Sequence, residues 1–182
     1  MAVPVRDGLT RADLDDLPDD GRRYELLDGR LFVTPVARRR HQWVVTQIAY
    51  RLKQWVEQHG GTVYAGVNVD LAEDTHLEPD AVFSYDEDLT GEGFVGAPEL
   101  AIEVSSPSTR SFDLGAKKDR YAAEGCREFW FIDLDREQLL TFRRRGERFD
   151  DPAVHERGDV VATPLLQGLE LDVDDALGPA GT

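Results

Sequence analysis

The stretch Leu100-Ala101-Ile102-Glu103-Val104, with Glu128-Phe129-Trp130-Phe131-Ile132-Asp133 farther along the chain, determines the fold that we expect. Both stretches are apolar enough to be buried strands. Between them we predict a helix that begins at Ser111 or Asp113 and ends near Glu124. A strand, a helix and a strand in so short a span predict a parallel pair. The sequence therefore predicts an α/β fold of the mixed α+β kind, with a central mixed β-sheet flanked by helices.

Further strand and helix patterns surround this unit. Asp28-Gly29 supplies the positive φ angles of a two-residue turn, which predicts an N-terminal β-hairpin with strands at Arg23–Leu27 and Arg30–Thr34. Apolar residues at helical spacing predict a helix over residues 38–59. The other expected elements are a short helix over 11–17, one bent strand or two short strands within 62–71, a strand over 79–84, a polar loop over 86–96, a strand over 138–143, and weaker strands near Val160 and Leu169.

The chain has 182 residues, which fits one domain with a core over about residues 23–171 and peripheral segments at 1–20 and 173–182. Its single cysteine, Cys126, excludes an intramolecular disulfide and a cysteine zinc cluster, and we expect it to be buried and unreactive. The first residues lack the pattern of a signal peptide, and no apolar stretch approaches the roughly 20 residues that span a bilayer. We therefore expect a cytoplasmic protein without a membrane partner.

The charge of the chain restricts how it could contact nucleic acid. A formal net charge of −15 counts against a broad phosphate-binding surface, because duplex affinity comes largely from cations that displace counterions. It does not exclude nucleic acid, because carboxylates in a metal site add to the acidic count. Two basic stretches, Arg38-Arg39-Arg40 and Arg143-Arg144-Arg145, are interpreted first as solvated surface. The sequence has no glycine-rich phosphate loop, no Gly-x-Ser-x-Gly and no His-Glu-x-x-His.

Two carboxylates stand out because they lie in apolar strands. Asp80 follows Glu78-Pro79 at the start of one expected strand, and Glu103 lies near the end of another. An unpaired carboxylate is costly to bury, so either each has a cationic partner or the two share one. Two carboxylates at a sheet edge suit Mg²⁺, which takes oxygen ligands and can activate a water. From spacing alone, a metal site and two structural carboxylates are equally good interpretations.

Lys117 is the candidate basic residue of this site. Asp113, Lys117 and Tyr121 are four residues apart and share one face of the expected helix, whose first turns can lean over the end of the Glu103 strand. Lys117 could then neutralise charge or orient a water. Alternatively, it forms an intrahelical pair with Asp113 worth about 0.3–0.5 kcal/mol. Tyr121 is assigned to packing.

Two further residues have open assignments. Glu25, in the hairpin, is either a third metal ligand or a solvent-facing residue. His41, at the start of the long expected helix, is interpreted as a surface or capping residue in preference to a residue of the cleft. Neither assignment follows from spacing alone.

Linked motifs then occur in order along the chain: Tyr24-Glu25-Leu26-Leu27-Asp28-Gly29, His41, Glu78-Pro79-Asp80, Ala97-Pro98-Glu99-Leu100-Ala101-Ile102-Glu103-Val104-Ser105-Ser106-Pro107-Ser108-Thr109, Asp113 with Lys117 and Tyr121, and Glu128-Phe129-Trp130-Phe131-Ile132-Asp133. In order and spacing they resemble the Uma2 family, also called DUF820, a group described as restriction endonucleases. The resemblance extends over about residues 23–171. Because several motifs are linked, it is far more specific than the dipeptide Pro-Asp.

The resemblance implies a restriction-endonuclease-like core of the PD-(D/E)xK superfamily, in which an Asp and a Glu bind the metal ion and a lysine assists the attacking water. Carried over to this chain, Asp80 and Glu103 are the expected metal ligands. Ser105 stands where the lysine two residues after Glu103 is expected, so the resemblance assigns that role to Lys117 on the following helix. Glu25 matches an additional acidic residue on an early element. The implied catalytic set is Asp80, Glu103, Lys117 and Glu25.

Two functions from different classes remain open at this point. The first is an endonuclease that needs Mg²⁺ or Mn²⁺ and hydrolyses phosphodiester bonds in nucleic acid, in DNA more than in RNA. The second is a non-catalytic interaction or assembly module with the nuclease fold and a link to mobile elements, which the acidic composition and the missing local lysine favour. A homodimer is a further expectation. Trp43, Trp55 and Trp130 offer aromatic surface for it, although at least two of them should lie in the core.

Overall fold

The computed structural model describes residues 7–34, 37–85, 89–90, 93–106 and 109–179. Its strands are β1 (Arg23–Leu27), β2 (Arg30–Thr34), β3 (Thr62–Ala65), β4 (Val69–Ala72), β5 (Thr75–Leu77), β6 (Ala81–Ser84), β7 (Leu89–Thr90), β8 (Gly93–Val95), β9 (Leu100–Val104), β10 (Glu128–Asp133), β11 (Gln138–Arg145), β12 (Arg148–Phe149), β13 (Ala153–His155), β14 (Val160–Val161) and β15 (Leu171–Asp172). Its helices are a 3-10 helix (Arg11–Leu14), α1 (Arg39–His59), α2 (Arg110–Phe112), a π-helical segment (Asp113–Lys117), α3 (Lys118–Ala123) and α4 (Val173–Leu177).

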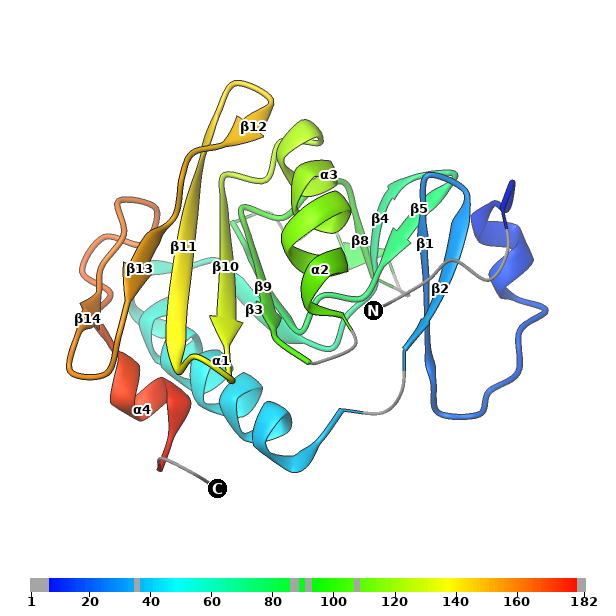
Figure 1. Ribbon diagram of the computed structural model, residues 1–182. Helices are drawn as coiled ribbons and strands as arrows, with labels where there is room; N and C mark the ends of the chain where they lie inside the picture. The colour runs from blue at the N-terminus through cyan, green and yellow to red at the C-terminus, as the bar shows by residue number, and fades with distance from the viewer. Residues whose placement is uncertain (1–6, 35–36, 86–88, 91–92, 107–108, 180–182) are drawn as a thin grey trace.

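The main sheet confirms the predicted mixed sheet with a parallel pair. Its strand order is β12-β11-β10-β9-β6-β3, and β13 also pairs with β11. Strands β9 and β10 run parallel with Glu103 opposite Phe131, and the run from α2 to α3 crosses between them (Figure 1). Strand β6 pairs antiparallel with β9, with Ala81 opposite Ile102. The two strands that carry or adjoin the candidate carboxylates are therefore neighbours.

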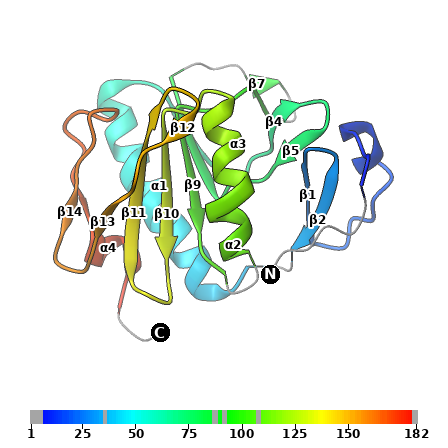
Figure 2. The same cartoon turned by 45° about the horizontal axis from the view of Figure 1, so that its top comes forward.

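The sheet buries a different set of side chains on each face. Along β9, Leu100, Ile102 and Val104 pack with α1, whereas Ala101 belongs to the cluster that contains Phe112 under the second helical run. Figure 2 shows α1 and the α2–α3 run on opposite faces of the sheet. Because side chains alternate along a strand, Glu103 shares the face of Ala101. Glu103 therefore points toward the helix that carries Lys117.

The predicted hairpin belongs to a second sheet, whose order is β2-β1-β5-β4-β8-β7. Asp28 and Gly29 adopt positive φ angles of 50° and 73°, as their turn requires. Residues 62–71, left open between one bent strand and two short ones, form the separate strands β3 and β4.

The expected loop over residues 86–96 is wrong where the structure describes it, because β7 and β8 lie there. Backbone pairing with a distant strand explains the error: Phe94 N donates to Asn68 O at 2.8 Å, and Gly96 N donates to Asp70 O at 2.8 Å. Residues 86–88 and 91–92 of that segment lie outside the described residues.

Both ends of the chain differ from the expectation. The short helix expected over residues 11–17 is a 3-10 helix that ends at Leu14. Residues 173–179 are not peripheral as expected, because Val173, Ala176 and Leu177 of α4 are buried in the core beside α1. Residues 180–182 lie outside the described residues. The side chain of Asp172 caps α4 by accepting hydrogen bonds from the backbone N–H groups of Asp174 and Asp175. None of the described helices is long and apolar enough to cross a membrane.

Candidate active site

Asp80 and Glu103 lie together where the neighbouring strands β6 and β9 meet the same end of the main sheet. Asp80 immediately precedes β6, and its backbone N–H donates to Ile102 O on β9 at 3.1 Å. Its carboxylate is also bonded to β9, because Val104 N donates a hydrogen bond to Asp80 Oδ2 at 2.8 Å. Both side chains are almost fully buried, with 2% exposure for each residue. The structure thus brings together the two carboxylates that the sequence singled out.

Lys117 completes this cluster from the helix above the strand end. Its Nζ lies 2.7 Å from Glu103 Oε1 and 2.5 Å from Glu25 Oε1. The ion pairs found for it among the described residues are with these two glutamates, so they replace the intrahelical pair with Asp113. Burial alone would lower the pKa of Lys117, but the two glutamates outweigh it and hold that pKa well above its ordinary value. Lys117 is therefore a permanent cation.

The helix is locally π-helical where it meets the carboxylates. Asp113–Lys117 forms a widened turn in which Gly115 leaves helical geometry, with φ −104° and ψ −111°. Such turns recur at functional sites in proteins. Both Asp113 and Lys117 are buried here, with 3% and 1% exposure. Tyr121 packs as expected, fully buried and stacked on Phe129 at 6.1 Å.

Glu25 enters the cluster from the hairpin of the second sheet. Its Oε1 accepts a hydrogen bond from Glu78 N at 3.0 Å and the ion pair from Lys117. Glu25 is 2% exposed, so the solvent-facing alternative for it is excluded. Glu25 of the second sheet and Glu103 of the main sheet are therefore joined through Lys117.

Among the described residues three donors hold Asp80, and two of them are side chains that sequence reasoning did not assign to the site. Arg23 Nη2 lies 2.8 Å from Asp80 Oδ1, and His41 Nε2 lies 3.0 Å from Asp80 Oδ2, which also accepts from Val104 N. Burial would raise the pKa of Asp80, but the hydrogen bond from His41, the charge of Arg23 and the Val104 N–H lower it below its ordinary value. The expectation that His41 is a surface or capping residue is wrong: it is 6% exposed and belongs to the site.

Both missed residues had a signal in the sequence. Arg23 and Glu25 are two residues apart in one strand, so their side chains share a face. His41 precedes Val44, Val45 and Ile48 at spacings of three, four and seven, which places it on the buried face of α1. The alternation and the helical period therefore place both side chains on buried faces, although they do not identify Asp80 as the partner.

The site contains more carboxyl groups than permanent cations. Glu25, Asp80, Glu103 and Asp113 face two permanent cations, Arg23 and Lys117. Burial raises the pKa of Glu103 well above its usual range, and the negative charges of Asp113, Asp80 and Glu25 add to that increase. Burial likewise raises the pKa of Asp113 to about 7. Buried carboxyl groups whose pKa is raised in this way are sites at which a divalent cation can replace a proton.

The donor set fits a hard divalent cation. Among the described residues, the buried atoms Asp80 Oδ1 and Glu103 Oε1 accept no well-directed hydrogen bond, although a nitrogen lies within 2.8 Å of each. No group of three or more histidine, cysteine, aspartate or glutamate side chains in the described part of the chain forms a ready metal cage. Two carboxylates with water in the other positions are nevertheless sufficient for Mg²⁺, which keeps much of its hydration. Asp80 and Glu103 are the residues that would hold it.

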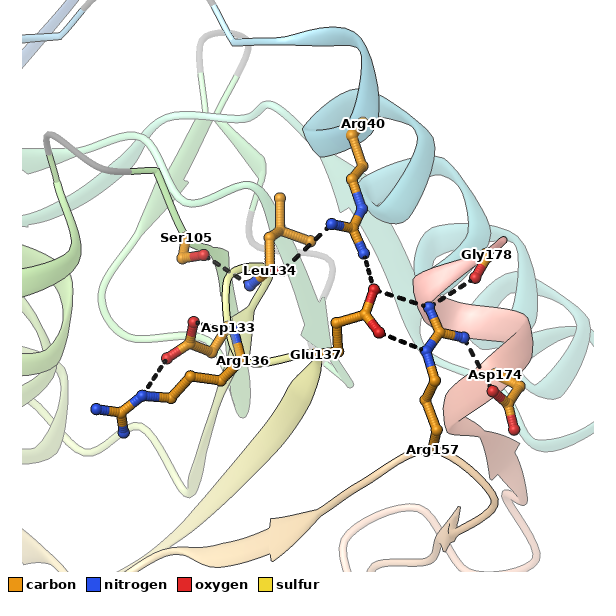
Figure 3. Close-up of polar contacts among 9 residues, drawn as sticks. All are labelled: Arg40, Ser105, Asp133, Leu134, Arg136, Glu137, Arg157, Asp174 and Gly178. Atoms are coloured by element: carbon orange, nitrogen blue, oxygen red, sulfur yellow. Dashed lines mark hydrogen bonds and ion pairs between the residues drawn. The ribbon is translucent and has the colours of Figure 1, made fainter. Parts of the chain in front are cut away.

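A pocket of about 500 Å³ opens onto this cluster. Its wall includes Arg23, Arg38 and Arg40, so one of the two basic stretches lies at the pocket in addition to being solvated. Arg40 is fixed there by Leu134 O at 3.2 Å and by Glu137 Oε1 at 2.6 Å. Figure 3 shows that Glu137 also binds Arg157, which contacts Asp174 and Gly178 at the C-terminal helix. This network connects α4 to the rim of the pocket.

Ser105, at the position of the absent lysine, is part of the strand framework. Its N–H donates to Ile132 O at 2.8 Å. Its Oγ accepts from Leu134 N at 2.9 Å, as Figure 3 shows. The serine therefore ties the end of β9 to the end of β10. The lysine of the site is Lys117, on the helical run that follows.

Comparison with solved structures identifies the class of fold. The crystal structure titled "a putative nuclease belonging to DUF820" from Anabaena variabilis ATCC 29413 matches with a TM-score of 0.79 and 18% sequence identity, over 93% of this chain and 98% of that chain. The protein thus has the fold of that structure. Residues 11–174 match the Uma2 family, described as "Putative restriction endonuclease". The chain belongs to the Uma2 family, as its motifs predicted. Comparison with curated proteins gives no match.

Proposed function

We propose that this protein is a metal-dependent endonuclease that hydrolyses phosphodiester bonds in DNA. The observation that carries the proposal is the convergence of Asp80, Glu103 and Lys117 in one pocket. Membership of a family described as restriction endonucleases supports nucleic acid as the substrate, and supports DNA over RNA. The proposed ion is Mg²⁺ or Mn²⁺, because the available ligands are carboxylate oxygens.

Each residue has a distinct role in the proposal. A divalent ion held by Asp80 and Glu103 would supply the Lewis acidity that activates water and stabilises charge on the phosphate. Lys117 stays protonated because its pKa is raised, so it donates hydrogen bonds to a phosphate oxygen and does not take a proton from water. Glu25 holds the lysine in place at 2.5 Å. The attacking water gives up a proton to solvent and its oxygen bonds to phosphorus as the bond to the leaving oxygen breaks. The leaving oxygen takes a proton from solvent, which yields a phosphate end and a hydroxyl end.

Glu103→Gln tests the proposal because it removes the ligand charge with little change in shape. With supercoiled plasmid DNA and Mg²⁺ or Mn²⁺, we expect the parent protein to nick or linearise the circles and Glu103→Gln to be inactive. Glu57→Gln is the matched control, because Glu57 is exposed on α1 and pairs only weakly with Lys53 at 4.0 Å. Equal cutting by the parent and Glu103→Gln would refute the assignment of Glu103. Parallel assays with single-stranded RNA separate the two nucleic acids.

The non-catalytic module is the alternative that this experiment has to exclude. Its support is the acidic chain and the fact that Asp80 already has Arg23, His41 and Val104 as donors. Titration calorimetry with Mn²⁺ separates the two functions. The endonuclease proposal predicts a binding heat that Asp80→Asn abolishes, together with a metal-dependent increase in melting temperature. No binding heat and no such increase would favour the module.

A further inference from the structure

Arg23 occupies a position in the site that the proposed mechanism does not use. It is the first residue of β1, and its side chain is 27% exposed at the wall of the pocket. Burial would lower its pKa, but the negative charge of Asp80 raises that pKa further above the ordinary range. The guanidinium is thus a fixed positive charge within reach of both the carboxylates and the open pocket.

The contacts of Arg23 are uneven. Among the described residues, the one short contact of its side chain joins Nη2 to Asp80 Oδ1 at 2.8 Å. The contacts to Glu78 are long, at 3.8 Å from Nε to Oε2 and 3.5 Å from Nη1 to the backbone oxygen. A side chain held mainly by one partner can leave when that partner binds something else.

The oxygen that Arg23 contacts, Asp80 Oδ1, is the one that would bind a metal ion. Asp80 Oδ2 is already shared by His41 and Val104 N–H, whereas Oδ1 faces Arg23 and accepts no well-directed hydrogen bond among the described residues. A divalent ion at Oδ1 and a guanidinium 2.8 Å from the same atom would repel each other strongly. The two cations therefore compete for one oxygen.

We propose that Arg23 is an exchangeable cation, which neutralises Asp80 until a divalent ion binds and then moves to the phosphodiester of the substrate. A guanidinium can donate two parallel hydrogen bonds to a phosphate, which a lysine ammonium cannot do. The pocket that Arg23 lines is where a phosphate next to Glu103 and Lys117 would lie. This inference rests on the proposed function and adds to it a phosphate-binding residue and a coupling between metal and substrate binding.

The exchange makes two binding equilibria depend on one residue, and neither measurement needs turnover. Replacing Arg23 with glutamine removes the competitor, so Mn²⁺ should bind more tightly by calorimetry, by about fivefold or more. The parent protein should bind a short fluorescent DNA duplex more tightly in Ca²⁺ than in EDTA. Arg23→Gln should lose this gain in affinity. In EDTA, Arg23→Gln and the parent should bind DNA alike, because Arg23 then remains on Asp80.

Arg30→Gln is the matched control, because Arg30 lies in the same hairpin, carries the same charge and is 62% exposed near Asp7. It should match the parent in both titrations. Arg23→Lys keeps the charge but loses the fork, so it should leave Mn²⁺ affinity near that of the parent and weaken DNA binding in Ca²⁺. It also provides the comparison if Arg23→Gln does not fold.

The outcomes separate this inference from the proposed function. If the parent binds no Mn²⁺, the proposed function fails and the exchange fails with it. If the parent binds Mn²⁺ but Arg23→Gln binds it equally or more weakly, Arg23 only holds Asp80 in place and the exchange alone is refuted. Retention by Arg23→Gln of the full Ca²⁺-dependent gain in DNA affinity would also refute it.

Discussion

Lys117 is the residue whose removal tests the charge balance of the site most directly. Its Nζ lies 2.7 Å from Glu103 and 2.5 Å from Glu25, and only 1% of its side chain is exposed. Replacement by methionine keeps an unbranched side chain of similar length in the same space. It leaves the two buried glutamates without their shared cation.

The expected magnitude follows from this geometry. At an effective dielectric constant of about 20, each attraction amounts to about 6 kcal/mol before the cost of burial is subtracted. Burial cancels much of that gain, and removal of one partner from a buried pair costs about 3–5 kcal/mol. We therefore expect Lys117→Met to lower the free energy of unfolding by about 3–5 kcal/mol at neutral pH. The loss should shrink in acid, because Glu103, whose pKa burial raises well above its usual range, takes up a proton there.

Urea unfolding followed by tryptophan fluorescence measures this loss. Lys118→Met is the matched control: Lys118 is the next residue, pairs with the exposed Asp119 at 3.0 Å, and should cost about 1 kcal/mol or less. The double variant Lys117→Met/Glu103→Gln should recover part of the loss, because it removes one of the unpaired charges. Equal losses for the two lysines, or no recovery in the double variant, would refute the reasoning.

Three further predictions concern other parts of the molecule. Burial raises the pKa of Asp113 to about 7, so the folded state holds a proton that the unfolded chain releases above about pH 4, and stability falls as the pH rises toward 7. Urea midpoints at about pH 5 and pH 8 should therefore differ less in Asp113→Asn than in the parent or in the exposed control Asp119→Asn, and identical differences would contradict this. Glu137→Gln should lower the free energy of unfolding by about 1 kcal/mol, because its carboxylate accepts hydrogen bonds from Arg157 and Arg40 but is partly screened by solvent. An unchanged melting temperature would exclude a stabilising role for Glu137. Burial raises the pKa of Cys126 to about 12, so iodoacetamide should label it only in urea, as mass spectrometry would detect, and rapid labelling of the native protein would be the contrary result.

The strongest local patterns predicted the centre of the fold. The run Glu128–Asp133 is buried at every position, and its parallel pairing with Leu100–Val104 followed from the helix between them. Asp28-Gly29 likewise identified its hairpin, because the turn itself requires positive φ. In these elements the short-range preference and the final packing agree, and local reasoning is then sufficient.

Elements whose partners are far away in the chain could not be predicted in the same way. Strand β8 exists because Phe94 N reaches Asn68 O, and Phe94 then packs on Tyr64 at 5.5 Å between ring centres. Nothing in the polar, glycine-rich segment around it indicates a strand. Helix α4 was missed for a similar reason: its five residues are stabilised by burial against α1 more than by their own helical preference.

The candidate site shows the same division between local and distant information. Asp80 and Glu103 stood out because a carboxylate in an apolar strand is costly, and that signal is local. The donors of Asp80 come from β1 and α1, far from it in the chain, so their identity depends on how the elements pack. The faces of Arg23 and His41 were readable from their periods, but a period states only that a side chain is buried. Which carboxylate it meets is decided by tertiary structure.

The position of the lysine follows from the same geometry. Ser105 directs its Oγ to Leu134 N at 2.9 Å, so the side chain at this position is directed toward the end of β10. Glu103 instead points to the face covered by the helix, because it alternates with Ile102 and Val104, which pack on α1. A cation delivered by the helix therefore approaches Glu103 from the side on which its carboxylate lies. The π-helical turn at Asp113–Lys117 places Lys117 there, which is why a lysine far along the chain can serve this carboxylate while its near neighbour in sequence serves the strand framework.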